Sequence, residues 1–200
     1  VVLRALDLAL ARGRYGRWLG GVEPQLEAAS QAPFRFSGLR HPLLVWQHKR
    51  SDGPPVVPIS VEVSPELRVV AITGPNTGGK TVTLKSIGLA ALMARAGMLL
   101  PCSGQPSLPW CAQVLADIGD EQSLQQSLST FSGHVKRIGR ILEALQRGGS
   151  PALVLLDEVG AGTDPSEGTA LATALLKALA ERARLTIATT HFGELKALKY

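Results

Sequence analysis

Residues 74–81 have the types and spacing of a loop that binds phosphate. They read, in order, Gly74, Pro75, Asn76, Thr77, Gly78, Gly79, Lys80 and Thr81, which matches Gly-x-x-x-x-Gly-Lys-Thr. Glycines let the backbone close around a phosphate, the lysine places positive charge on phosphate oxygens, and the final hydroxyl suits Mg²⁺. Asn76 is well placed for a γ-phosphate or an attacking water. The loop therefore predicts a nucleoside triphosphate bound with Mg²⁺.

The segments on either side of this loop have the periodicity that such chemistry requires. Residues 67–73 are rich in β-branched side chains and predict a buried strand, and residues 82–96 carry apolar side chains at helical spacing. A helix that begins at the loop turns its unpaired N–H groups and positive dipole end toward the phosphates. A chance glycine-rich turn would lack this context of strand, loop and helix.

Two carboxylates follow a second apolar strand, predicted over residues 153–156. Asp157 is expected to hold Mg²⁺ through the metal's water shell, and Glu158 to act as a general base for the attacking water. The alternative, a solvated pair of acids at a strand end, is disfavoured by the phosphate loop. A third strand, over 185–190, ends at His191, which would donate to the γ-phosphate or orient the water and base. Ligands of open α/β sheets bind beyond the carboxyl ends of the strands, so these groups should share one edge.

The helix between these last two strands has clear start signals. Asp164 suits the N-cap, Pro165 suits the first helical position, and Glu167 completes a capping box. Apolar side chains then recur at a spacing of four and are expected to lie in the core; they are Leu171, Leu175 and Leu179.

Residues 117–131 form a polar stretch that a kinase or small GTPase would have no reason to carry. Ser129 and Thr130 precede an amphipathic helix, so they are candidate N-caps. The same position also presents hydroxyls to a phosphate, including one held by a second subunit. The predicted helix runs to residue 147 and carries on one face Phe131, Val135, Ile138, Leu142 and Leu145.

The composition is that of a globular α/β protein: 45% of the 200 residues are hydrophobic and only 18% are charged. The net charge of +5 permits contact with nucleic acid, but the basic residues are dispersed. For Lys136, Arg137 and Arg140, a solvated face and a polyanion site are equally good accounts. Aromatic residues are few and not interleaved with the basic runs, so a base-stacking surface is not indicated.

The two cysteines, Cys102 and Cys111, have no metal-ligand spacing and are expected to be buried, reduced thiols. No signal peptide or run long enough to span a membrane is apparent, which favours the cytoplasm.

The motifs together resemble the ATPase domain of the MutS family, which is related to ABC-type ATPases. The residues that carry the resemblance are 74–81, 117–122, 129–131, 153–158, 160–165 and 189–191, and residues 40–43 resemble the segment that precedes the phosphate loop in that family. After the acidic pair the chain reads Gly160-Ala161-Gly162-Thr163-Asp164-Pro165. This is similar to the second bacterial branch, MutS-II, and differs from the mismatch-recognising branch.

The resemblance implies a P-loop ATPase of the ABC/MutS type that uses ATP and Mg²⁺ and works as a homodimer. It implies a mostly parallel central sheet flanked by helices, with an antiparallel portion near the N-terminal side. The resemblance also implies roles within one chain: residues 74–81 bind the triphosphate, Thr81 and Asp157 bind Mg²⁺, Glu158 activates water and His191 senses the γ-phosphate. Gln122 would link the nucleotide to the rest of the protein. Across the dimer, the resemblance implies that Ser129 and Thr130 contact the partner's ATP and that Gly162, Thr163 and Asp164 form the dimer seam.

The expected organisation has two parts. Residues 1–19 are expected to form the end of a preceding helical domain, with Leu3, Leu6 and Leu10 on one side of a helix. Residues 20–200 are expected to form an ATPase domain truncated at its C-terminus. Short extended pieces are expected at residues 34–36, 43–45, 98–101 and 113–116.

The MutS-II resemblance implies a bacterial protein that controls recombination or repair at branched or damaged DNA, or acts at stalled ribosomes. Those contacts would use domains absent from these 200 residues, so no nuclease activity is expected here. Two alternatives stay open. One is an ABC-type ATPase of another system, although residues 128–131 read Leu-Ser-Thr-Phe where such proteins carry Leu-Ser-Gly-Gly. The other is a nucleotide-binding scaffold with negligible turnover, against which the two adjacent acids count.

Overall fold

Helices and strands alternate along the chain in the computed structural model, which describes residues 2–27, 32–51, 53–75, 78–119, 127–148 and 151–193, for 127–130 the backbone only. Within these residues the elements are α1 (Val2–Leu19), β1 (Gln25–Glu27), β2 (Phe34–Leu39), α2 (Pro42–Ser51), β3 (Ile59–Val63), β4 (Val69–Thr73), α3 (Lys80–Arg95), β5 (Ser107–Pro109), β6 (Gln113–Asp117), α4 (Ser127–Gly148), β7 (Ala152–Leu156), α5 (Pro165–Arg182) and β8 (Leu185–Thr190).

The chain divides into two compact units. The first unit consists of Val1–Pro65 and Lys85–Trp110, and the second of Glu66–Leu84 and Cys111–Tyr200. Each unit has its own four-stranded sheet, in the order β1-β5-β2-β3 in the first and β4-β8-β7-β6 in the second. The chain is therefore a mixed α/β protein, as its sequence predicts.

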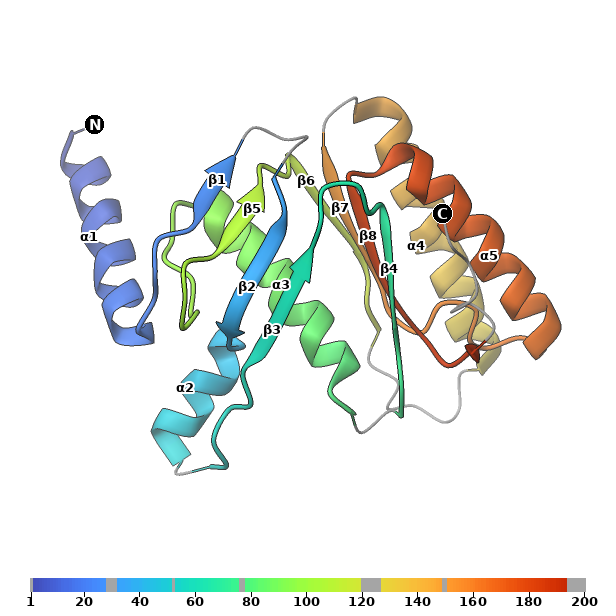
Figure 1. Ribbon diagram of the computed structural model, residues 1–200, viewed down its shortest axis with the longest axis horizontal. Helices are drawn as coiled ribbons and strands as arrows, with labels where there is room; N and C mark the ends of the chain where they lie inside the picture. Colours follow the sequence, from blue (N-terminus) through green and yellow to red (C-terminus); the bar gives the residue numbers. More distant parts are fainter. Residues whose placement is uncertain are drawn as a thin grey trace. The chain divides into compact units, whose positions relative to one another are not determined.

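The sheet of the second unit is parallel throughout (Figure 1). Thr73 of β4 lies opposite Thr190 of β8, and Asp117 of β6 lies opposite Leu156 of β7. Every residue of β7 and β8 is buried, as expected for central strands covered on both faces. The strands predicted from the sequence over 153–156 and 185–190 are thus confirmed, and their carboxyl ends lie at one edge.

Helices α4 and α5 pack together beside this sheet, where Figure 1 draws them in yellow and orange. Their inward faces close a core with the strands. Its buried members are Ile141, Val154, Leu156, Val159, Ala172, Leu175, Leu176, Leu179, Ala183 and Ala188. The partly buried Ile138, Leu142 and Leu145 pack against this core, in agreement with the predicted face of α4.

The stripe predicted for α5 is only partly buried. Leu179 and Leu175 are 0% and 6% exposed, but Leu171 is 40% exposed, so its assignment to the core was wrong. A helix turns 100° per residue, so positions four apart drift by about 40° per step. Two such steps rotate Leu171 away from the direction in which Leu179 faces the core.

In the first unit, the expected antiparallel portion is present as the pairing of β2 with β3 and with β5, whereas β1 pairs with β5 in parallel. Strand β2 includes the predicted piece at 34–36 and alternates between buried Phe34 and Phe36 and exposed Arg35 and Ser37. This alternation is typical of a strand with one face in a core.

One expectation for the first unit was wrong. Residues 43–45 are helical, because Pro42 starts α2 and Val45 donates its N–H to the carbonyl of His41. The extended piece expected at 98–101 contains Leu100, which makes an isolated antiparallel bridge with Val22. The helix expected near the start of the chain is present as α1, and its leucines are exposed, at 80% for Leu3, 56% for Leu6 and 50% for Leu10.

Both cysteines are buried thiols that form no disulfide within the described residues, as predicted. Burial raises the pKa of the Cys102 thiol to about 11, partly offset by the charge of Arg40, so this thiol is protonated at neutral pH. Across the described parts of the chain, no helix has the length and apolar character needed to cross a membrane.

Replacement of Leu179 by Ala tests the core described for α5. We expect Leu179→Ala to lower the free energy of unfolding by about 2–5 kcal/mol, because it leaves a cavity at a fully buried position. The same change at the half-exposed Leu171 should cost less than about 1 kcal/mol. Urea unfolding followed by circular dichroism measures both. Equal losses would contradict the orientation of α5.

Candidate active site

The loop after β4 has the backbone geometry that glycine permits. Gly74 and Gly79 have φ angles of +148° and +74°, which other residues rarely adopt. A Cβ atom added at either glycine would meet no atom of the described residues within 4 Å. Asn76 and Thr77 lie outside the described residues.

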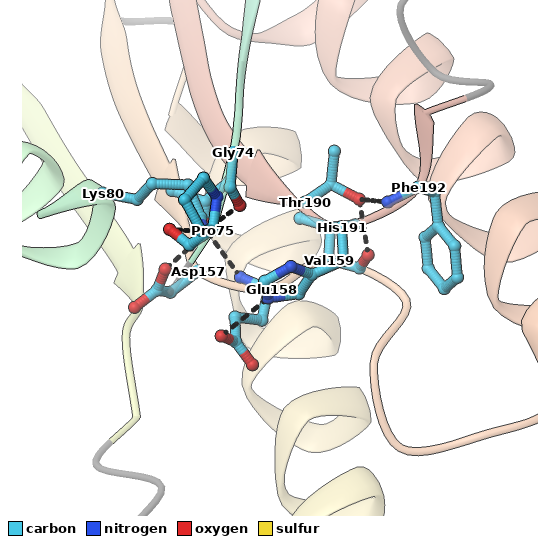
Figure 2. Close-up of polar contacts among 10 residues, drawn as sticks. Gly74, Pro75, Lys80, Asp157, Glu158, Val159, Thr190, His191 and Phe192 are labelled. Atoms are coloured by element: carbon cyan, nitrogen blue, oxygen red, sulfur yellow. Dashed lines mark hydrogen bonds and ion pairs between the residues drawn. The ribbon is translucent and has the colours of Figure 1, made fainter. Parts of the chain in front are cut away.

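Lys80 is the first residue of α3 and is only 6% exposed. Its ammonium folds back over the loop and donates to the carbonyl oxygens of Gly74, at 2.6 Å, and Pro75, at 2.9 Å (Figure 2). Thr81 follows within the first turn of α3. The helix therefore begins with a cation and a hydroxyl directly after the glycines.

Two acids lie where β7 ends. Asp157 is 6% exposed and donates its N–H to the carbonyl of Asp117, at 2.9 Å. Glu158 has a φ of +51° and is the only non-glycine residue with positive φ among those described. Its N–H donates to the hydroxyl oxygen of Thr189, at 2.8 Å, and that hydroxyl donates to Asp157 Oδ1, at 2.5 Å. The turn that carries both acids is thus bonded to the neighbouring strands on each side.

His191 follows β8 and pairs with the second acid. Its Nε2 lies 3.1 Å from Glu158 Oε1, and the side chains are 41% and 15% exposed. Figure 2 shows the loop residues, both acids and His191 at the same edge of the sheet. The predicted location of these groups, at one edge of the sheet, is therefore confirmed.

Asp117 forms a buried polar cluster with α4 that the sequence did not indicate. The Asp117 side chain is 3% exposed, and its carboxylate contacts His134 Nδ1, at 2.7 Å, and Arg137 Nε. The sequence left Arg137 undecided between a solvated face and a polyanion site. The spacing of His134 and Arg137, one helical turn apart, is the signal by which a shared partner could have been suspected.

The remaining predicted residues lie on α4, α5 and the turn before α5. Ser129 and Thr130 lie inside the first turn of α4, which begins at Ser127, and not before it as expected; Gln122 lies outside the described residues. Asp164 is the N-cap of α5, as predicted, and accepts from the N–H groups of Ser166 and Glu167. The Glu167 carboxylate accepts a hydrogen bond from the hydroxyl of Thr163, at 2.9 Å.

The turn before α5 approaches that helix closely. Gly160 and Gly162 have φ angles of +84° and +89°. A Cβ at Gly160 would meet the carbonyl oxygen of Gly168 at 2.5 Å, so glycine is needed for both conformation and space.

Comparison with known proteins identifies the class to which this site belongs. The family model of MutS domain V matches residues 70–200, which include the loop, both acids and the histidine. The chain therefore belongs to the MutS family and carries the family's ATPase domain.

Its relatives lie in the branch that the sequence motifs indicated. The chain is 58% identical to Endonuclease MutS2 of Synechocystis sp., covering 98% of this chain and 26% of the relative. The Endonuclease MutS2 proteins of Thermomicrobium roseum and Geobacillus kaustophilus are 49% and 48% identical, covering 96% and 99% of this chain and 24% of each relative. The resemblance to the MutS-II branch is confirmed, and the chain spans about a quarter of the length of these relatives.

The cluster around Asp117 can be tested by neutralising its carboxylate. We expect Asp117→Asn to lower the free energy of unfolding by about 1–3 kcal/mol, since the buried oxygens would lose charge-assisted bonds. Glu143→Gln is the matched control, because its partner Arg147 lies 3.4 Å away and both side chains are largely exposed. The control should cost less than about 0.5 kcal/mol. Similar effects of both changes in urea unfolding would contradict a structural role for Asp117.

The cap of α5 predicts a dependence of stability on pH. The bonds from the Ser166 hydroxyl, and then from the N–H groups of Ser166 and Glu167, hold the pKa of Asp164 below its ordinary value of 3.8. The stability from this depressed pKa is present above the unfolded value and is lost as pH falls through the folded one. Asp164→Asn keeps a capping side chain but cannot titrate. The melting temperature of the wild type should therefore fall more than that of Asp164→Asn between about pH 5 and about pH 3. Parallel curves would contradict the assignment.

Proposed function

We propose that this chain binds ATP with Mg²⁺ and hydrolyses it to ADP and phosphate, as a P-loop NTPase of the ABC/MutS type. The observation that carries the proposal is the meeting of four groups at one sheet edge: the glycine loop, Lys80, the Asp157–Glu158 pair and His191. A cationic loop at a helix start attracts phosphate, and carboxylates beside it suit a metal and a base.

The residues present fit Mg²⁺. This cation prefers oxygen ligands and binds through one or two carboxylates together with substrate phosphates. Asp157 is 6% exposed and offers a carboxylate that is held in place by two bonds, from its N–H to the carbonyl of Asp117 and from the Thr189 hydroxyl to Oδ1. Thr81 offers a hydroxyl at the start of α3. Bound there, the metal would neutralise charge on the phosphates.

The chain's own groups would divide the work of hydrolysis. Lys80, now bonded to the loop carbonyls, would exchange those bonds for phosphate oxygens, which accept more strongly because they are charged. Glu158 would take the proton of the attacking water, and His191 would hold the Glu158 carboxylate or donate to the γ-phosphate. The left-handed backbone of Glu158 sets where that carboxylate points.

At the level of the whole protein we propose an ATP-driven homodimer switch in control of recombination or repair at branched or damaged DNA, or at stalled ribosomes, in the bacterial cytoplasm. Gln122 would link the nucleotide to the rest of the protein, Ser129 and Thr130 would reach the partner's ATP, and Gly162, Thr163 and Asp164 would line the seam. To shift the ratio of closed to open dimer from 1:99 to 99:1, ATP must bind the closed state more favourably than the open state by about 5.5 kcal/mol.

The division into residues 1–19, from a preceding helical domain, and 20–200 remains part of the proposal. Membership of the MutS family disfavours an ABC-type ATPase of another system. The activity in the name of the relatives is not proposed for this chain, which spans about a quarter of their length.

The proposal is tested by measuring ATP hydrolysis as the concentration of the chain is raised. Specific activity that climbs with concentration is expected, because Ser129 and Thr130 would complete the partner's site. Specific activity that is appreciable but constant would mean that each chain hydrolyses ATP alone, and would contradict the dimer switch. ATP binding without turnover at any concentration would favour the scaffold alternative.

Two variants separate binding from chemistry. Lys80→Ala should weaken ATP binding at least about tenfold, and Glu158→Gln should bind ATP while lowering kcat by about 10²–10⁴-fold. Arg182→Gln, at the exposed far end of α5, is the matched control and should retain both properties. Unchanged turnover in Glu158→Gln would remove Glu158 from the role of general base.

A further inference from the structure

The hydroxyl of Thr189 connects the two acids of the candidate site. It donates to Asp157 Oδ1, at 2.5 Å, and accepts the N–H of Glu158, at 2.8 Å. We propose that Thr189 is a positioning residue, which fixes the Asp157 carboxylate for the metal's water shell and the Glu158 backbone for its role as base. This inference rests on the function proposed above and gives a role to Thr189, which the sequence motifs include within residues 189–191 without assigning it one.

The direction of these two bonds is determined by the groups themselves. A backbone N–H can only donate, so the Thr189 oxygen must accept from Glu158. The single hydroxyl proton is then free to point at Asp157 Oδ1. Asp157 accepts this bond through Oδ1, which leaves the second carboxylate oxygen for other ligands.

The bond from the Glu158 N–H to the Thr189 hydroxyl matters because the backbone at Glu158 is left-handed. A left-handed conformation is unfavourable for a residue with a Cβ and persists only where the surroundings hold it. Around Glu158 the adjacent N–H groups are also bonded, that of Asp157 to the carbonyl of Asp117 and that of Val159 to the carbonyl of Thr189, both at 2.9 Å. Of the three N–H groups of residues 157–159, Thr189 therefore accepts two, that of Glu158 through its hydroxyl and that of Val159 through its carbonyl.

Two other buried threonines of β8 provide a comparison within the same strand. Thr186 is 0% exposed, and its hydroxyl has no hydrogen-bond partner among the described residues. Thr190 is 1% exposed; its hydroxyl accepts from the N–H of Phe192, at 3.1 Å, and approaches the carbonyl of Val159, at 3.5 Å. Of these three hydroxyls, the one at Thr189 contacts the acids, so burial alone does not account for its position.

The test replaces Thr189 by Val, which keeps the branched shape and removes the hydroxyl. The Mg²⁺ concentration that half-saturates binding of a fluorescent, non-hydrolysable ATP analogue should rise between about 10- and 100-fold, the usual effect of losing a partner that orients a metal ligand. In hydrolysis at saturating Mg²⁺, kcat should fall by a similar factor while KM for ATP stays within about twofold, because the loop residues are untouched. Thr189→Ser should restore both, and Thr186→Val should change neither.

Each outcome decides between distinct conclusions. An unchanged Mg²⁺ midpoint in a folded Thr189→Val, with only a lower melting temperature, would overturn the inference and leave Thr189 as a packing residue. Failure of Thr189→Ser to restore the midpoint would overturn it as well. Should the valine variant not fold, Thr189→Ala carries the same readouts. A wild-type chain that binds the analogue without any effect of Mg²⁺ would instead contradict the proposed function itself.

Discussion

Parallel pairing of β4, β8, β7 and β6 is the constraint on which the site depends. Because these strands run in one direction, the residues that follow each of them emerge at the same edge. The central strands are buried on both faces and therefore have no room for reactive groups along their length. The polar groups of the candidate site therefore lie just beyond the strands, and the apolar core formed with α4 and α5 holds those positions in place.

Much of the second unit was predictable from local patterns. Long apolar strands, the glycine loop and the capped start of α5 each carry their own signal over a few residues, so β7, β8 and the N-cap at Asp164 were located correctly. Errors arose where a local pattern was short or drifted. The apolar triplet at 43–45 was too brief to distinguish a strand from the start of α2, and a spacing of four placed Leu171 on the wrong side of its helix.

Side-chain partnerships were less predictable than elements, since they join residues that are distant in sequence. Thr189 and Asp157 are separated by 32 positions, and Arg137 and Asp117 by 20. The same limit applies to Lys49 and Trp18 in the first unit, which are 31 positions apart in the sequence. Lys49 Nζ lies 4.6 Å from the centre of the Trp18 ring, a contact that only the tertiary fold makes. Arg50 lies over Trp46, one turn earlier in α2, so that contact follows from the helix itself.

The left-handed backbone at Glu158 sets stability against the role proposed for this residue. Glycine at this position would relieve strain of about 1 kcal/mol, but it would remove the carboxylate that pairs with His191. Selection for thermostability alone would thus be expected to enrich substitutions that remove the proposed base. A screen of this chain for thermostability therefore needs ATP hydrolysis as a second criterion, since the most stable residue at position 158 would lack the carboxylate on which the proposed hydrolysis depends.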